Sequence, residues 1–262
     1  TVTSPRHLFP LRPERARRPE RAARHPESGQ RAVAIGGPVR DGPFAALLSD
    51  VEHYYSARLR RHGATALGVD WNSPMTQRLR FVQLLKVVDW SAGPISLHDL
   101  GCGYGALLEH LEDRHPDAPV DYVGTDLSLP MIEKARRLWA SRAHVRFEPT
   151  GAQMPRAGYT VASGIFNVCL GHPVAAWEEL VESTLRQMCA SSDRGFAVNF
   201  MTTRTWAQRP STVGQLYAVE PKRWVDFCAE ALGCEVRCVE DYGLSEFTLM
   251  ATNSRSRTTG AT

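Results

Sequence analysis

A chain of 262 residues, 43% hydrophobic and 23% charged, has the composition of a globular protein with one main core and an appendage. No apolar stretch reaches the roughly 18 residues of a membrane span. No apolar signal-peptide core follows the N-terminus either, so we expect a cytoplasmic protein without a membrane partner. The six cysteines contain no CxxC pair, which argues against a disulfide framework or zinc site, and we predict no metal.

Positive charge is concentrated at the N-terminus. Residues 1–40 hold nine arginines against three glutamates, a net charge of +6, which leaves −3 for the rest of a chain whose total is +3. Six prolines and almost no aromatic residues predict a disordered, Arg/Pro-rich extension over residues 1–42. It is either a nucleic-acid or partner-binding arm or a non-essential extension. The second interpretation is favoured, because no aromatic residues alternate with the arginines to stack on bases.

Two helices are expected next. Apolar residues recur at helical spacing from Phe44 to Tyr55, and Gly63 is placed to end that helix. Asn72 or Ser73 can cap a second helix that has Pro74 in its first turn. We therefore predict a helical N-terminal cap over residues 43–93.

From residue 94 onward, short apolar runs alternate with amphipathic segments of helical length, which indicates a parallel sheet with crossover helices. The predicted strands are 95–99, 120–126, 144–148, 159–164 and 195–201, and the predicted helices are 104–114, 128–141, 174–190 and 221–232. The stretch 234–251 contains two strand-like runs with no helix between them, which predicts a closing hairpin. We expect one domain over residues 94–253 and a flexible tail over 254–262.

The stretch "HDLGCGYG" places three glycines at alternate positions directly after the first predicted strand. A dinucleotide-binding loop would read G-x-G-x-x-G, and a phosphate-binding P-loop would need Lys followed by Ser or Thr. Neither pattern is present. A glycine-rich turn at the carboxyl edge of an open α/β sheet is a ligand-binding position, so we predict a ligand without phosphate.

The sequence here resembles the class I S-adenosylmethionine (SAM) dependent methyltransferases, whose first motif is an apolar strand followed by acid-x-G-x-G-x-G. Three further features follow in the family's order: Asp126 in "YVGTDLS", the fourth-strand stretch "YTVASGIFNV", and the terminal hairpin. The resemblance covers about residues 95–251. The resemblance implies an α/β, Rossmann-like fold with a seven-stranded sheet and an antiparallel last strand. The stretch "HGATALGVDWNSPMTQRLRF" is similar to one in bacterial members that carry only a generic methyltransferase label.

The resemblance also implies a SAM site. Asp126 would hold the ribose hydroxyls, and Asp99 would face the methionine ammonium or orient the turn. Many relatives place an acid for the adenine amino group where this chain has Ala152 and Gln153, so Gln153 or a backbone carbonyl would take that role. The full predicted cofactor-binding set is Asp99, Gly101, Cys102, Gly103, Tyr104, Gly105, Asp126, Leu127, Met131, Ala152, Gln153 and Ser163.

The methyl acceptor is less constrained. The text "SGIFN" after the fourth strand is not the Asn/Asp-Pro-Pro-aromatic signature of many DNA and protein amino-group methylases, and no Pro-Cys pair is present. We expect transfer to O, N or C of a small molecule, in specialised or sugar metabolism. Candidate catalytic residues are His172 and Asn167, and candidate substrate contacts are Tyr55, Trp71 and Arg80.

Four of these candidates also have an ordinary structural interpretation. His172 could be a solvent-exposed loop histidine, Tyr55 a core residue, Trp71 a packing residue and Arg80 part of a solvated helix face. Two other functions stay open: an RNA or protein methyltransferase that holds a polyanion with its arginine-rich arm, and a SAM-binding module without turnover.

Overall fold

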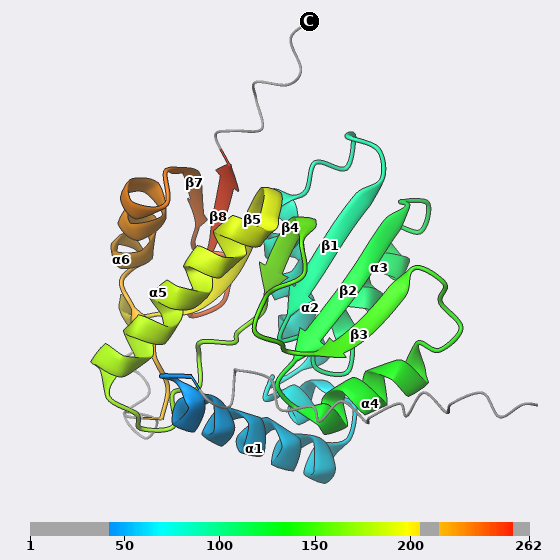
Figure 1. The fold of residues 1–262 in the computed structure, drawn as a ribbon, viewed down its shortest axis with the longest axis horizontal. Helices are drawn as coiled ribbons and strands as arrows, with labels where there is room; N and C mark the ends of the chain where they lie inside the picture. Colours follow the sequence, from blue (N-terminus) through cyan, green and yellow to red (C-terminus); the bar gives the residue numbers. More distant parts are fainter. Residues whose placement is uncertain (1–41, 205–214, 254–262) are drawn as a thin grey trace, which may run out of the picture. The chain divides into compact units, whose positions relative to one another are not determined.

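The computed structural model describes residues 42–204 and 215–253. Their centre is a sheet with the strand order β3-β2-β1-β4-β5-β8-β7, and a short strand, β6, pairs with β5 off this path (Figure 1). The strands are β1 (Ile95–Leu100), β2 (Val120–Asp126), β3 (Val145–Pro149), β4 (Ala157–Ala162), β5 (Ser192–Thr202), β6 (Ala218–Val219), β7 (Cys234–Val239) and β8 (Glu246–Asn253). β8 is antiparallel to both β5 and β7, which confirms the predicted closing hairpin.

The helices follow the predicted order. They are α1 (Ala45–His62), η1 (Ala66–Val69), α2 (Pro74–Leu84), η2 (Leu85–Val87), α3 (Ala106–Arg114), α4 (Leu129–Leu138), α5 (Val174–Ser191), α6 (Pro221–Asp226) and η5 (Phe227–Ala231). Gly63 ends α1 with a positive φ of 68°, and the Ser73 side chain caps α2 by accepting a hydrogen bond from the Thr76 N–H. Both predicted helix boundaries in the N-terminal cap are confirmed.

Helices cover the two faces of the sheet (Figure 1). α5 crosses one face, where Trp177 and Leu185 pack with Phe196, and α2 and α3 lie behind the sheet, where Leu84 and Leu107 are buried. In β5, Phe196, Val198 and Phe200 belong to the α5 side and Ala197 to the other side. This alternation is the period-two pattern of a strand buried on both faces.

Several predicted boundaries differ from the structure by two or more residues, and glycine conformation explains two of them. The helix expected from residue 104 begins at Ala106, because Gly105 precedes it with a left-handed φ of 88°. The strand expected to reach residue 164 ends at Ala162, because Gly164 turns the chain with a φ of 69°. The last crossover helix changes to a π-helix at Phe227. The two-residue strand β6 is an addition to the seven expected strands.

The topology brings three sequence features to one edge of the sheet. β1 lies between β2 and β4, and all three run parallel. The glycine-rich turn after β1, Asp126 at the end of β2 and Ser163 after β4 therefore share the carboxyl edge. α1 passes beneath this edge (Figure 1). Within residues 42–204 and 215–253, no helix is both long and apolar enough to cross a bilayer.

Candidate active site

The three glycines of the turn all adopt left-handed conformations, with φ of 76° at Gly101, 56° at Gly103 and 88° at Gly105. A Cβ atom on Gly101 would lie 2.4 Å from Cγ2 of Ile165, and one on Gly105 would lie 2.5 Å from Nε1 of Trp139. The protein's own packing therefore excludes side chains at these two positions.

Asp126 ties the glycine-rich turn to the end of β2. Its Oδ2 accepts a hydrogen bond of 2.9 Å from the Gly103 N–H, and its Oδ1 accepts one of 2.8 Å from the Ser128 N–H. Burial raises the pKa of the Asp126 carboxyl above its usual value. Since each carboxylate oxygen can accept two hydrogen bonds, the group keeps acceptor capacity for a ligand.

Asp99 is a second buried acid at this edge, with an exposed fraction of 3%. The Tyr122 hydroxyl donates a 2.6 Å hydrogen bond to its Oδ2. Burial raises the pKa of Asp99 to about 7, although the hydrogen bond from Tyr122 opposes the shift. A cation beside this carboxyl would favour its ionised form.

A cavity of about 360 Å³ lies against the glycine-rich turn. Its other walls come from α1, α5, the segment 150–154 and the turn after β4. The predicted site residues that line it are Tyr55, Trp71, Asp99, Gly101, Cys102, Gly103, Tyr104, Asp126, Leu127, Met131, Ala152 and Ser163. The structure thus brings together residues that the sequence spreads from α1 to the end of β4.

The charged groups of the cavity are all acidic. Glu52, Asp99 and Asp126 line it, and among the described residues no arginine, lysine or histidine does so. A cavity lined by one sign of charge raises the local concentration of ligands of the opposite sign. This cavity therefore favours a ligand that carries positive charge.

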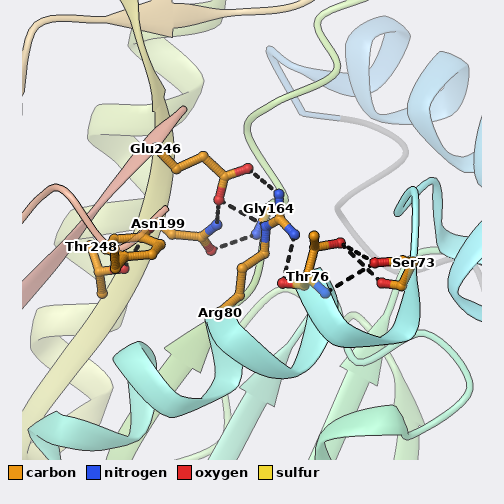
Figure 2. A network of polar contacts seen from close by, with 8 residues as sticks. Ser73, Thr76, Arg80, Gly164, Asn199, Glu246 and Thr248 are labelled. Atoms are coloured by element: carbon orange, nitrogen blue, oxygen red, sulfur yellow. Dashed lines mark hydrogen bonds and ion pairs between the residues drawn. The ribbon is translucent and has the colours of Figure 1, made fainter. Parts of the chain in front are cut away.

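Five predicted site residues are not in the lining. Gly105 starts α3 against Trp139, and Gln153 is exposed. His172 is directed to α1, where its Nε2 lies 3.0 Å from Oδ2 of Asp50. Asn167 and Arg80 are buried, and Arg80 forms an ion pair with Glu246 (Figure 2).

Sequence reasoning missed several residues that line the cavity, notably Glu52, Gln77 and, on α5, Leu180 and Thr184. Glu52 lies three residues before Tyr55, so helical spacing puts both on one face of α1. That spacing could have pointed to Glu52. For the α5 residues no such signal exists, because their spacing is that of an ordinary buried helix face.

Comparison with known proteins identifies the class. A family model described as "Methyltransferase domain" matches residues 98–191. The protein named "Putative methyltransferase Rv1506c" of Mycobacterium tuberculosis (strain ATCC 25618 / H37Rv) is 38% identical over 160 residues, which are 61% of this chain and 94% of that protein. With the glycine-rich turn and the strand order, these matches show that the chain belongs to the class I SAM-dependent methyltransferases. Its cofactor is SAM.

Solved structures share the fold at low sequence identity. Magnesium protoporphyrin IX methyltransferase from Synechocystis PCC 6803 with bound SAM is 14% identical, with a TM-score of 0.56 over 79% of this chain and 97% of that one. An O-methyltransferase family 2 protein from Planctomyces limnophilus DSM 3776, in complex with apigenin, is 10% identical, with a TM-score of 0.53 over 82% and 67% of the two chains. These likenesses show the fold.

The residues of the cavity fit SAM chemically. The cofactor carries a sulfonium and an ammonium, which suit the acidic lining, and ribose hydroxyls, which suit the free acceptor capacity of Asp126. The Ser163 Oγ lines the cavity and is buried without a hydrogen-bond partner in the protein, so it is available to a ligand.

We expect SAM binding to strengthen as pH rises through the pKa of Asp99. Below about pH 7 this carboxyl is mostly protonated, and above it the negative charge that a bound ammonium prefers is present. Calorimetry should show the Kd for SAM falling several-fold between about pH 5.5 and 7, since one titrating group changes affinity by at most about tenfold per pH unit. Asp99→Asn should weaken the dependence, and the part that remains reports on Asp126, whose pKa burial also raises. A flat profile for the parent protein would contradict this role of Asp99.

Proposed function

We propose that this protein transfers the methyl group of SAM to an O, N or C atom of an uncharged small molecule. The observation that carries the proposal is the cavity itself. It lies between α1 and the carboxyl edge of the sheet and is lined mainly by apolar and aromatic side chains, and the charged groups that the described residues contribute to it are all acidic. A polyanion such as RNA would need basic groups near the transfer point.

The proposed division of the cavity follows its walls. Asp126 accepts hydrogen bonds from the ribose hydroxyls, and Asp99 faces the methionine ammonium. Leu127 and Met131 pack on the adenine, whose amino group meets backbone carbonyls near Ala152, because Gln153 is exposed and outside the lining. SAM supplies an activated methyl on a positive sulfur, and these residues orient it and exclude water.

The acceptor would approach near the end of β4, where Ser163, Gly164 and Trp71 line the cavity. We assign no general base, since His172 pairs with Asp50 outside the lining. Two proteins of similar fold support a small acceptor: one is named for magnesium protoporphyrin IX, and the other was solved with apigenin. The arginine-rich segment 1–40, on which the RNA or protein alternative depends, lies outside the described residues.

Transfer of labelled methyl groups tests this proposal. The protein would be incubated with methyl-labelled SAM and two fractions of a cell extract, one of dialysable small molecules and one of RNA and protein. We expect label only in the dialysable fraction, and much less of it when Asp126→Asn replaces the parent at the same SAM concentration. Label in RNA or protein would overturn the proposal. Tight binding of SAM without label in either fraction would instead favour the SAM-binding module.

A further inference from the structure

A buried polar network joins α2, β5 and β8 to Gly164, in the turn after β4 (Figure 2). Arg80 of α2 meets Glu246 of β8 through two contacts, Nε to Oε2 at 2.8 Å and Nη2 to Oε1 at 2.5 Å. The Arg80 Nη1 also donates to the Thr76 carbonyl oxygen at 2.8 Å. Arg80 is 7% exposed and Glu246 is 5% exposed. Their geometry is the two-point fork that fixes both position and orientation.

One arm of this network reaches the turn after β4. The Asn199 Nδ2 donates to Glu246 Oε2 at 2.7 Å, and its Oδ1 accepts from the Gly164 N–H at 2.9 Å. Asn199 is fully buried in β5. The Asn199 amide thus links Glu246 to the Gly164 N–H through two hydrogen bonds.

The other arm reaches Trp71. The Arg80 guanidinium carbon lies 3.8 Å from the centroid of the Trp71 ring. A Cβ atom on Gly164 would lie 2.2 Å from Cη2 of the same ring. The two arms therefore meet at one contact, the indole of Trp71 against the backbone of Gly164. Both of these residues line the cavity, whereas Arg80, Glu246 and Asn199 do not.

The position of this contact in the cavity is defined by the glycine-rich turn. Ile165, the residue after Gly164, packs directly on Gly101. A shift of the Gly164 turn would thus move the wall that faces the glycine-rich turn. Buried ion pairs are costly and add little net stability, and the best-attested reason to keep one is that it specifies a geometry.

We propose that Arg80, Glu246 and Asn199 are positioning residues that hold Trp71 against Gly164 and so set the shape of the SAM cavity at the end of β4. They act through Trp71 and Gly164 without touching the ligand. This replaces the expectation that Arg80 contacts the substrate. The proposal depends on the SAM site alone, and it holds whatever the acceptor is.

Arg80→Lys tests the fork and the stacking together, because lysine keeps the charge but has neither the planar group nor the two-point contact. Calorimetry with S-adenosylhomocysteine (SAH), the demethylated product, should show binding weakened about tenfold, comparable to the loss of one well-placed interaction. The matched control is Arg78→Lys on the same helix, where the arginine is exposed and meets Asp113 at 3.5 Å. That variant should bind SAH like the parent. Unchanged SAH binding by folded Arg80→Lys would overturn the proposal.

A double-mutant cycle shows whether Arg80 acts through Trp71. In a Trp71→Ala background, Arg80→Lys should change SAH affinity by less than about twofold, since the side chain on which Arg80 acts is gone. If the two changes multiply instead, Arg80 acts on the ligand independently of Trp71, and the positioning role is wrong.

Fluorine NMR of protein labelled with 5-fluorotryptophan separates positioning from general loss of structure. The Trp71 signal is assigned by its absence in Trp71→Phe. Arg80→Lys should shift or broaden this signal and leave those of the buried Trp177 and Trp224 unchanged. If Arg80→Lys does not fold, Glu246→Gln replaces it in the calorimetry and in the fluorine NMR. A Trp71 signal that stays unchanged while SAH binding weakens would contradict the proposal.

Discussion

Gly103→Val should abolish detectable binding of SAM and SAH. Gly103 has a φ of 56°, a left-handed conformation that costs other residues about 1 to 2 kcal/mol and is worst for β-branched side chains. A Cβ atom there would lie 3.0 Å from Cγ1 of Val69, and the residue lines the cavity. The added methyl groups would displace the turn or occupy ligand space. Calorimetry with SAH, together with thermal unfolding, measures both effects.

Gly93→Val is the control for backbone strain. Gly93 has a φ of 85°, and no atom lies within 4 Å of a Cβ placed on it, so valine there meets the same left-handed strain without a clash. We expect it to lower the free energy of unfolding and leave SAH binding intact. Equal loss of binding in both variants would mean that strain, and not the shape of the site, explains Gly103→Val.

Asp126→Asn should weaken SAH binding by at least tenfold. Hydrogen bonds to a charged group contribute about 1.5 to 3 kcal/mol each, and a tenfold change in Kd corresponds to about 1.4 kcal/mol. Asparagine keeps one carbonyl oxygen, which can accept from only one of the two backbone donors, Gly103 or Ser128, because its NH₂ group is a donor, so the turn stays partly held. Asp126→Ala leaves both N–H groups without this acceptor, and we expect it to lower the melting temperature as well.

Asp121→Asn provides the comparison, since Asp121 is an exposed acid on the same strand that meets Arg146 at 3.4 Å. Its SAH affinity and melting temperature should match those of the parent. Titration of the Asp126 variants beside this control decides the assignment. If Asp126→Asn binds SAH as tightly as the parent, Asp126 holds the turn alone and another group must meet the ribose.

The sequence by itself determined the order of strands and helices along the chain and the closing hairpin. It also placed the glycine-rich turn, Asp99 and Asp126 at one edge of the sheet. These features depend on contacts between residues near in sequence. The spacing of apolar residues specifies a strand or a helix within one segment, and Ser73 and Gly63 set helix ends through neighbours a few residues away. The rule that parallel strands end at a common edge then brought the predicted site together.

Only the tertiary structure decided which buried groups meet. Arg80 and Glu246 are 166 positions apart, and nothing in either neighbourhood marks one as the partner of the other. His172 could equally have entered the cavity, but the packing of α1 brings Asp50 to it instead. Gly105 must lack a side chain because Trp139 and Phe147 pack against its backbone. Such contacts depend on how whole helices and strands are placed relative to one another. Many residues far apart in the sequence determine that placement together, so the spacing of residues within one segment does not predict it.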